Sequence, residues 1–294
     1  MTALDFVGLT PLMKRTSGNA AVKIGLIDGP ILANHPDLTS GHVSEIPGTN
    51  GAACNRADST ACMHGTFVAG ILFANRNSQA PAICPNCTLI VRPVFTESKS
   101  DRTGMPSSTP DELAAAVIEC VESGARVINL SLALARPSTK GEKALEEAFD
   151  YAAKRQVIIV AASGNQGTLG SSAITRHPWV IPVVACDLRG RPVSMSNLGS
   201  SIGRNGLSAP GYNITSLGAG GKPLTLSGTS AAAPFVTGAI ALLMSEFPRK
   251  SSAELKLAVT GGYARRRNNL VPPVIDVDGA YRTLAAVKTR SFAA

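Results

Sequence analysis

The chain has 294 residues, of which 44% are hydrophobic and 16% are charged. This composition fits a folded protein with a large core and excludes an intrinsically disordered chain. No apolar run reaches the roughly 18 residues that a membrane span needs. Residues 1–19 lack the basic start, apolar core and cleavage site of a signal peptide. The expected location is therefore the cytoplasm, with a mature secreted domain as the alternative.

The net charge is +8, and the basic excess is concentrated towards the C-terminus. It comes from Arg249, Lys250, Lys256, Arg265, Arg266, Arg267, Arg282, Lys288 and Arg290. Such an excess indicates either an acidic partner, such as nucleic acid or an acidic peptide, or a solvated surface. Aromatic residues do not interleave with these charges, as they do in single-strand binders. The solvated surface is favoured, and neither a nucleic-acid nor a membrane partner is expected.

Short apolar runs alternate with helical stretches along the chain. The runs cover residues 22–27, 89–95, 127–132, 157–162 and 180–186. Nearly continuous apolar runs are typical of strands that are buried on both faces of a parallel sheet. The pattern predicts an α/β fold with a mainly parallel central sheet flanked by helices. No linker or repeat interrupts it, so residues 1–294 are expected to form one domain, with residues 1–20 as an N-terminal extension.

The helical stretches carry recognisable start and stop signals. Thr109 and Glu112 have the spacing of a capping box, and Gly124 is a suitable end for the helix that they open. A second amphipathic helix is predicted over residues 142–155. Residues 231–247 are apolar almost all round, which predicts a helix in the middle of the core.

The six cysteines include two local pairs, Cys54 with Cys62 and Cys84 with Cys87. Local disulfides and free thiols remain equally open for these pairs. Four such cysteines could hold zinc, but the spacing of the first pair does not fit a zinc knuckle or ribbon. The other two are expected to be small core residues: Cys120 and Cys186.

Two short segments raise a choice between structural and catalytic roles. Asp28 ends a predicted strand and is followed by Gly and Pro, so on its own it is interpreted as a turn residue. Ser230 lies where a Gly-containing loop enters the buried helix, which suits an N-cap or a nucleophile equally well. Pro234 is expected to be tolerated there, because the N–H groups of a first helical turn lack helical partners.

A serine nucleophile needs a base, and the base needs a carboxylate that orients it. His64 is the only one of the four histidines that opens a helix-like segment punctuated by glycines. Asn165 lies in a Gly-Asn turn after a predicted buried strand. It is either a turn residue or an amide donor for a developing oxyanion.

The order Asp, His, Asn, Ser resembles the subtilisin-like serine proteases over nearly the whole chain. SGTSAAAP around Ser230 is similar to the family's GTSMAxP, and HGTFVAG from His64 is similar to HGTHVAG. AASGNQG around Asn165 resembles the family's oxyanion segment. Four motifs in the family order form a specific signal. The resemblance implies a three-layer fold around a mainly parallel sheet.

The resemblance also implies the role of each site residue. Ser230 attacks the scissile carbonyl, His64 takes its proton, and Asp28 fixes the imidazole. Asn165 and the Ser230 backbone N–H form the oxyanion hole. Substrate is expected to pair as an added strand with residues that include Ser131, Leu132, Ala133, Ala162, Ser163, Gly164 and Thr229.

Several positions depart from the family pattern. Gly29 replaces the hydroxyl residue after the aspartate, and Phe67 replaces the second histidine of HGTH. Ala133 replaces a glycine, so its methyl group is expected to narrow the first specificity pocket. Residues 74–81, which follow the histidine helix, contain no carboxylate, so the family's calcium loop is not supported. No metal or other cofactor is expected.

Four longer stretches resemble the cyanobactin-type maturation proteases, which cut leader or follower segments from ribosomal precursor peptides. They are IDGPILANHPDL, ACMHGTFVAGILFA, ICPNCTLIVRPVF and RRRNNLVPPVIDVDGAYR. The chain also begins close to its first strand, without an evident inhibitory propeptide. We therefore expect a cytoplasmic processing endopeptidase whose partner is a peptide substrate, with an acidic precursor as one candidate.

Three alternatives remain. A general degradative subtilase would use the same residues. A pseudoprotease would bind peptides without cutting them, but the complete set of four site residues argues against it. A nucleotide-binding protein would rest on the glycines of residues 218–221, and no predicted helix follows them as the dinucleotide fingerprint requires.

Overall fold

The computed structural model describes residues 1–38, 42–47, 54–95, 97, 108–132, 142–261 and 269–290. Its central sheet contains β1 (Lys23–Asp28), β2 (Val43–Glu45), β3 (Thr88–Pro93), β4 (Val127–Leu130), β5 (Ile158–Ala162), β6 (Val180–Cys186) and β7 (Leu207–Pro210). The order across the sheet is β2-β3-β1-β4-β5-β6-β7, and every neighbouring pair is parallel. A separate antiparallel hairpin pairs β8 (Ile214–Ser216) with β9 (Leu224–Leu226).

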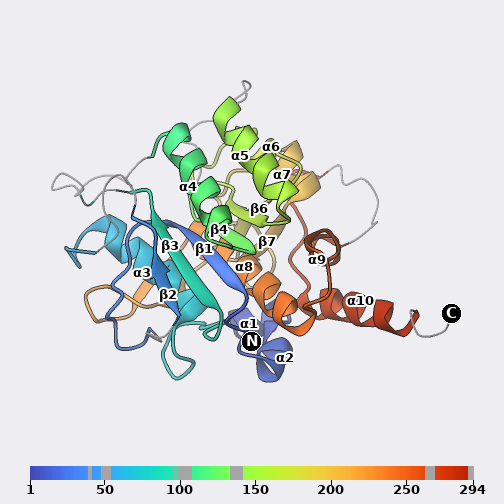
Figure 1. The fold of residues 1–294 in the computed structure, drawn as a ribbon, viewed down its shortest axis with the longest axis horizontal. Coiled ribbons are helices and arrows are strands. Elements are labelled where there is room, and N and C mark those ends of the chain that lie inside the picture. The colour runs from blue at the N-terminus through green and yellow to red at the C-terminus, as the bar shows by residue number, and fades with distance from the viewer. Residues whose placement is uncertain are drawn as a thin grey trace.

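Helices cover both faces of this sheet (Figure 1). They are α1 (Ala3–Phe6), α2 (Leu9–Arg15), α3 (Thr60–Phe73), α4 (Pro110–Glu122), α5 (Lys143–Lys154), α6 (Ala173–Arg176), α7 (Ser200–Asn205), α8 (Thr229–Glu246), α9 (Ser252–Val259) and α10 (Val277–Arg290). Successive strand residues point to opposite faces, so Leu26 joins the core under α3 and α8 while Ile27 joins the core under α4 and α5. The predicted α/β fold with a parallel sheet between two helical layers is confirmed.

The strand order reverses direction at β1. The chain passes from β1 to β2 at the edge of the sheet, comes back to β3 beside β1, and then crosses to the other side of β1 with β4. In open parallel sheets, ligands bind beyond the carboxyl ends of the strands at such a switch point. Asp28 is the last residue of β1, so the topology places it at this switch point, and the region beyond the carboxyl ends of β1, β4 and β5 is called the crevice below.

Two helix ends differ from the sequence-based expectation. The Thr109 side chain accepts the Glu112 N–H at 3.2 Å, but the Glu112 carboxylate accepts from the buried Arg92 at 2.8 Å instead of closing the capping box. Helix α8 begins at Thr229, so Pro234 is its sixth residue and lies beyond the first turn. Because proline has no N–H, the Ser230 carbonyl lacks the helical donor that residue 234 would otherwise supply.

The N-terminal residues fold back onto the body. Helix α2 packs against α10, and α1 packs against α2, while α10 runs outwards towards the C-terminus (Figure 1). Leu9 and Leu12 of α2 are buried in the larger core. Among the described residues, no helix combines the length and the apolar character needed to cross a membrane.

Candidate active site

Asp28 and His64 form a buried pair at the crevice. His64 Nδ1 donates to Asp28 Oδ1 at 2.7 Å, and the Gly29 N–H donates to the same oxygen at 2.6 Å. Asp28 is fully buried and His64 is 6% exposed. Asp28 Oδ2 and His64 Nε2 have no hydrogen-bond partner among the described residues. With Nδ1 carrying the proton, Nε2 is the nitrogen that is left to act as a base.

Close backbone packing explains the unusual glycine after Asp28. A Cβ atom on Gly29 would collide with the Ala61 carbonyl in the first turn of α3. A Cβ atom on Gly65 would collide with the carbonyls of Gly29 and Pro30. Helix α3 therefore rests directly on the turn after β1, and no hydroxyl residue fits between them. This contact brings His64 within reach of Asp28.

The surroundings of His64 adjust its basicity. Burial by itself would lower its pKa, because the charged imidazolium loses water. The negative charge of Asp28 and the hydrogen bond outweigh that effect and raise the pKa of His64 above its ordinary value of 6.5. A base with a raised pKa accepts a proton more readily, provided that the pH keeps it neutral before reaction.

Ser230 is not the cap of its helix. Gly228 occupies the N-cap position of α8 with a φ of 143° and has no side chain with which to cap the helix, and Ser230 is the second helical residue. Its hydroxyl makes no hydrogen bond within the described part of the chain, while its N–H lies in the first turn, where backbone donors lack helical partners. The structure thus excludes the N-cap interpretation and leaves the hydroxyl free at the positive end of the helix dipole.

Asn165 is held by the turn that precedes Ser230. Its Oδ1 accepts the Thr229 N–H at 2.9 Å and the Thr229 hydroxyl at 3.0 Å. The same hydroxyl accepts the Gly164 N–H at 3.2 Å. Because Oδ1 is engaged twice, the orientation of the amide plane is set, and Nδ2 of this exposed residue remains free to donate. That is the donor that an oxyanion hole requires.

The expected substrate segments follow two neighbouring strands. Ser131 and Leu132 follow β4, while Ala162 and Ser163 lie at the end of β5, and these strands are paired in parallel. They therefore emerge at the same edge of the sheet as Asp28. Ala133 lies outside the described residues.

Thr229 was expected to contact substrate, but the structure assigns it a different position. It is fully buried, and its hydroxyl is engaged by Asn165 and Gly164. A side chain buried in this way orients the oxyanion segment and does not face the crevice.

Sequence analysis also missed a buried polar pair behind the site. Asn129 and Thr237 are both fully buried and hydrogen-bonded to each other at 2.8 Å. The sequence signal that could have indicated this pair is Asn129 itself, a polar residue inside the otherwise apolar strand β4.

The two cysteine pairs have different states. Cys54 and Cys62 form a disulfide that ends in the first turn of α3, two residues before His64. The Cys84–Cys87 disulfide that sequence analysis left open is not formed. Both thiols are free and buried, and the Cys87 N–H donates to the Cys84 carbonyl to close a turn. Burial and the neighbouring thiol raise the pKa of Cys84.

The segment after α3, residues 74–81, is tied to the end of α2 by Arg76. Calcium favours carboxylates and free carbonyl oxygens, and no carboxylate is present there. The Arg76 guanidinium donates to four backbone carbonyls at 2.6 to 3.4 Å, two at the end of α2 and two just after this segment. These four carbonyls belong to Met13, Thr16, Ala82 and Ile83. Arg76 thus links the end of α2 to the segment that follows α3.

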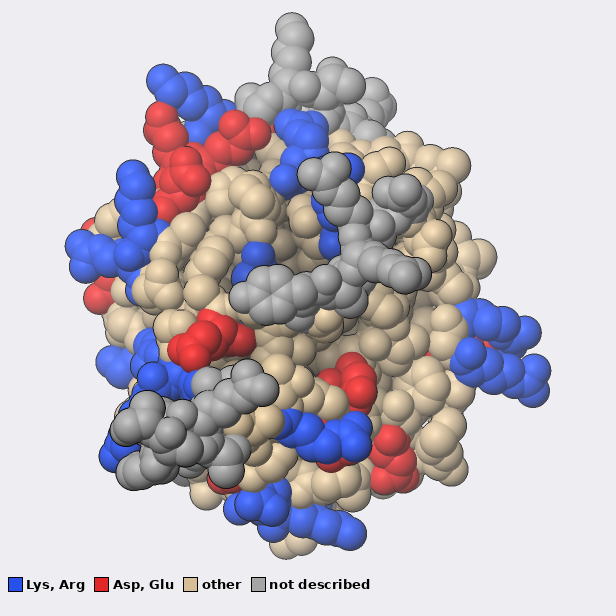
Figure 2. All heavy atoms as spheres, turned by 90° about the vertical axis from the view of Figure 1, so that its right-hand side faces the viewer, with Lys and Arg blue, Asp and Glu red and all other residues tan. Residues whose placement is uncertain are grey.

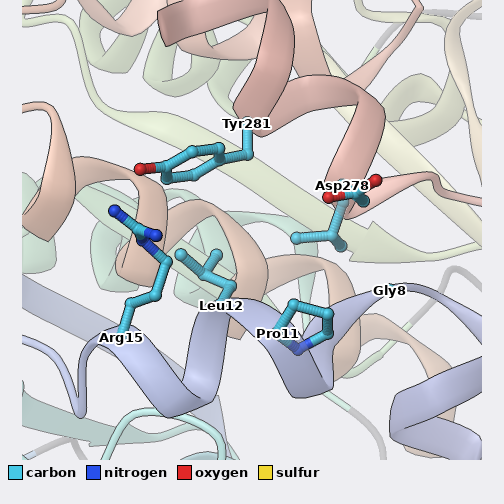
Figure 3. A pocket seen from close by; sticks show the side chains of 7 residues that line it. Gly8, Pro11, Leu12, Arg15, Asp278 and Tyr281 are labelled. Carbon is cyan, nitrogen blue, oxygen red and sulfur yellow. The ribbon is translucent and has the colours of Figure 1, made fainter.

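A small pocket of about 160 Å³ lies between α2 and α10. In Figure 3 the Arg15 guanidinium lies against the ring of Tyr281, and Leu12 and Pro11 on α2 face Tyr281 and Asp278 on α10. Arg15 is 3.7 Å from Glu246, the last residue of α8. Ser230 is sixteen residues earlier in that helix, about 24 Å away at 1.5 Å per residue. The pocket is therefore separate from the crevice.

Comparison with known proteins agrees with this geometry. Residues 19–263 match the Subtilase family. The chain is 31% identical to subtilisin DY of Bacillus licheniformis, over 81% of each protein. It spans only 57% to 61% of the length of several other curated relatives. Fold and sequence together define a serine endopeptidase. The chain belongs to the subtilase family.

Two solved structures are also similar over nearly the whole chain. A mutant of the protease domain of PatA has a TM-score of 0.82 at 30% identity, covering 92% of this chain and 97% of that one. The prenylagaramide maturation protease PagA has a TM-score of 0.81 at 27% identity, covering 94% and 98%. The resemblance to cyanobactin-type maturation proteases is confirmed.

Proposed function

We propose that this subtilase cleaves peptide bonds with Ser230 as the nucleophile, His64 as the general base and Asp28 as the orienting carboxylate. The observation that carries the proposal is the buried hydrogen bond between His64 Nδ1 and Asp28 Oδ1. It fixes the tautomer in which Nε2 can take a proton. The Ser230 hydroxyl, which would give that proton, is likewise unengaged within the described chain.

The reaction follows from these positions. Ser230 Oγ attacks the scissile carbonyl carbon as its proton moves to His64 Nε2. The negative charge that develops on the carbonyl oxygen is held by Asn165 Nδ2 and the Ser230 N–H. His64 then gives the proton to the leaving amine, and a water molecule releases the acyl group from Ser230 by the same steps. Asp28 stays ionised and stabilises the imidazolium.

A fluorophosphonate probe tests this assignment, because it reacts with an activated serine. Wild-type protein should be labelled at Ser230, and Ser230→Ala should abolish both labelling and peptide cleavage. Ser227→Ala removes a serine from the same loop and should react as wild type does. If the wild type is neither labelled nor active, the chain is a peptide-binding pseudoprotease.

We further propose that the substrate is a ribosomal precursor peptide that loses a leader or follower segment. PagA is described as a prenylagaramide maturation protease, and its likeness to this chain supports the idea. An acidic precursor is less well supported. Lys and Arg are dispersed among Asp and Glu on the face in Figure 2, and Lys250 and Arg282 pair with Glu254 and Asp278.

Selectivity separates processing from general degradation. Purified enzyme should cut a candidate precursor at one position, detected by mass spectrometry, and leave casein largely intact. Broad cleavage of casein would favour a degradative enzyme. The proposal includes a cytoplasmic location, where a reducing environment would open the Cys54–Cys62 disulfide, and the redox state of protein isolated from its native cells tests that part.

A further inference from the structure

A chain of buried hydrogen bonds joins the helix of Ser230 to the strand that precedes Ser131. Thr237 Oγ1 donates to Asn129 Oδ1 at 2.8 Å, and Asn129 Nδ2 donates to Ser131 Oγ at 2.5 Å. Thr237 and Asn129 are fully buried, and Ser131 is 3% exposed. Asn129 lies in the centre of the sheet, where its neighbours are Leu26 on β1 and Val160 on β5.

An amide in such a position requires an explanation. Burying a polar group costs free energy unless it is hydrogen-bonded. An apolar residue could fill the same volume without needing hydrogen-bond partners. A fully satisfied polar network, by contrast, permits one arrangement of the elements that it joins. Here those elements are β4 and α8.

The position of Thr237 on α8 makes this link relevant to Ser230. The two residues are seven positions apart, which places them two turns apart on the same side of the helix. Pro234 lies between them and removes the helical donor to the Ser230 carbonyl. The first turn of α8 is therefore tied less firmly by the helix itself. Thr237 is the buried side chain just beyond that point that bonds to the sheet.

We propose that Asn129 is a positioning residue that sets the register between Ser230 and substrate bound along the strand end at Ser131. This inference rests on the proposed function, because it takes the added-strand mode of substrate binding as given. Asn129 and Thr237 touch neither the reacting atoms nor the substrate. They act by holding α8 at a fixed distance from the segment that aligns the substrate backbone.

The inference predicts a loss that depends on substrate length. An extended peptide is aligned by the strand end, whereas a short ester reaches Ser230 without that alignment. A displacement of about 1 Å can cost up to roughly 10²-fold in rate. Thr237→Val keeps the shape of the side chain and removes the hydroxyl. It should lower kcat for a peptide with four residues before the scissile bond by ten-fold or more, with KM little changed.

The controls test a short substrate in Thr237→Val and then compare three further variants. Hydrolysis of a single-residue ester and the rate of fluorophosphonate labelling should fall less than about three-fold in Thr237→Val. Thr237→Ser retains the hydroxyl and should restore peptide cleavage. Ser245→Ala removes a comparable hydroxyl from α8, one that bonds to the Ala241 carbonyl, and should leave both substrates unaffected. Ser131→Ala breaks the chain at its other end and should reproduce the length dependence, even if Thr237→Val does not fold.

Equal losses on the peptide and the ester, or no loss on either, would overturn the role of Asn129. Failure of Thr237→Ser to restore activity would do the same. A wild-type enzyme that neither cleaves these substrates nor reacts with fluorophosphonate would overturn the proposed function, and this inference with it.

Discussion

A single carboxylate oxygen of Asp28 accepts both the imidazole of His64 and the backbone N–H of Gly29, at 2.7 and 2.6 Å. The second oxygen is buried without a partner among the described residues. The carboxylate therefore interacts with its surroundings almost entirely through the side that faces His64. The basicity of the imidazole should depend strongly on this one group.

The pH profile of cleavage should show that dependence. His64 accepts a proton only when it is neutral, and its pKa is raised above 6.5 by Asp28. Wild-type kcat/KM should therefore rise with pH and level off only above that raised pKa. Asp28→Asn removes the charge, so burial dominates and the inflection should move to lower pH.

The same variant should retain the fold and lose about 10⁴-fold in kcat, because the amide no longer selects the reactive tautomer. Circular dichroism would check the fold, and steady-state kinetics between pH 5 and 10 would give both quantities. A near-normal rate in Asp28→Asn would make Asp28 a turn residue and contradict the proposed triad.

The oxyanion donor and its support should have separable effects. Asn165→Ala removes the amide and should lower kcat by about 10²–10³-fold with a smaller change in KM. Thr229→Val leaves the amide in place but removes the hydroxyl that holds Oδ1, so its loss should be intermediate. Asn86→Ala alters an exposed asparagine in the Cys84–Cys87 turn and should have no effect. Loss in Thr229→Val but not in Asn165→Ala would contradict this division of roles.

Arg76, a half-buried cation, should stabilise the fold through its bonds to backbone carbonyls. Arg76→Met removes the donor from four carbonyls and should lower the free energy of unfolding by about 2–3 kcal/mol, the scale of hydrogen bonds to a charged group. Arg282→Met removes an exposed pair with Asp278 and should cost less than about 1 kcal/mol. Urea denaturation measures both.

The absence of a calcium loop remains a prediction. Thermal unfolding of the wild-type protein with and without a chelator tests it. A chelator such as EDTA should leave the midpoint of thermal unfolding unchanged. A marked drop that calcium reverses would show that a bound ion, and not Arg76 alone, holds this region.

Thiol counting tests the cysteine assignment. All six cysteines lie in the described chain, four as buried free thiols and two in one disulfide. Protein prepared without reductant should show almost no reactive thiol when native, four in denaturant, and six after reduction. Replacing Cys54 and Cys62 together should lower the free energy of unfolding by about 2–3 kcal/mol, because a short loop is released. Two thiols in denaturant would instead place a second disulfide at Cys84 and Cys87.

The sheet was predictable because strands that are buried on both faces of a parallel sheet have nearly continuous apolar sequences. Their apolar runs and the family order of four motifs determined the fold class and the chemistry. The hydroxyl of Ser230 was harder to interpret, because a serine at a helix start can cap or react. Only the observed start at Thr229, with Gly228 as cap, separates these roles.

The remaining features depend on contacts between distant segments, which local patterns do not record. Glu112 leaves its capping position for Arg92, twenty residues away. The roles of Thr229, Arg76 and Asn129 likewise arise from partners brought together by the fold. A short cysteine spacing could not distinguish the bonded pair from the free one, since both were compatible with a local bridge.

The contact between Gly29 and Gly65 has a wider consequence. Strand and helix meet there through backbone alone, so no side chain can act as an adjustable spacer between them. The distance between the Asp28 carboxylate and the His64 imidazole is therefore set by the backbone. It should vary little with temperature or with substitutions elsewhere in the core. Any substitution that adds a side chain at either glycine should push α3 away from β1 and separate the carboxylate from the imidazole before it unfolds the protein.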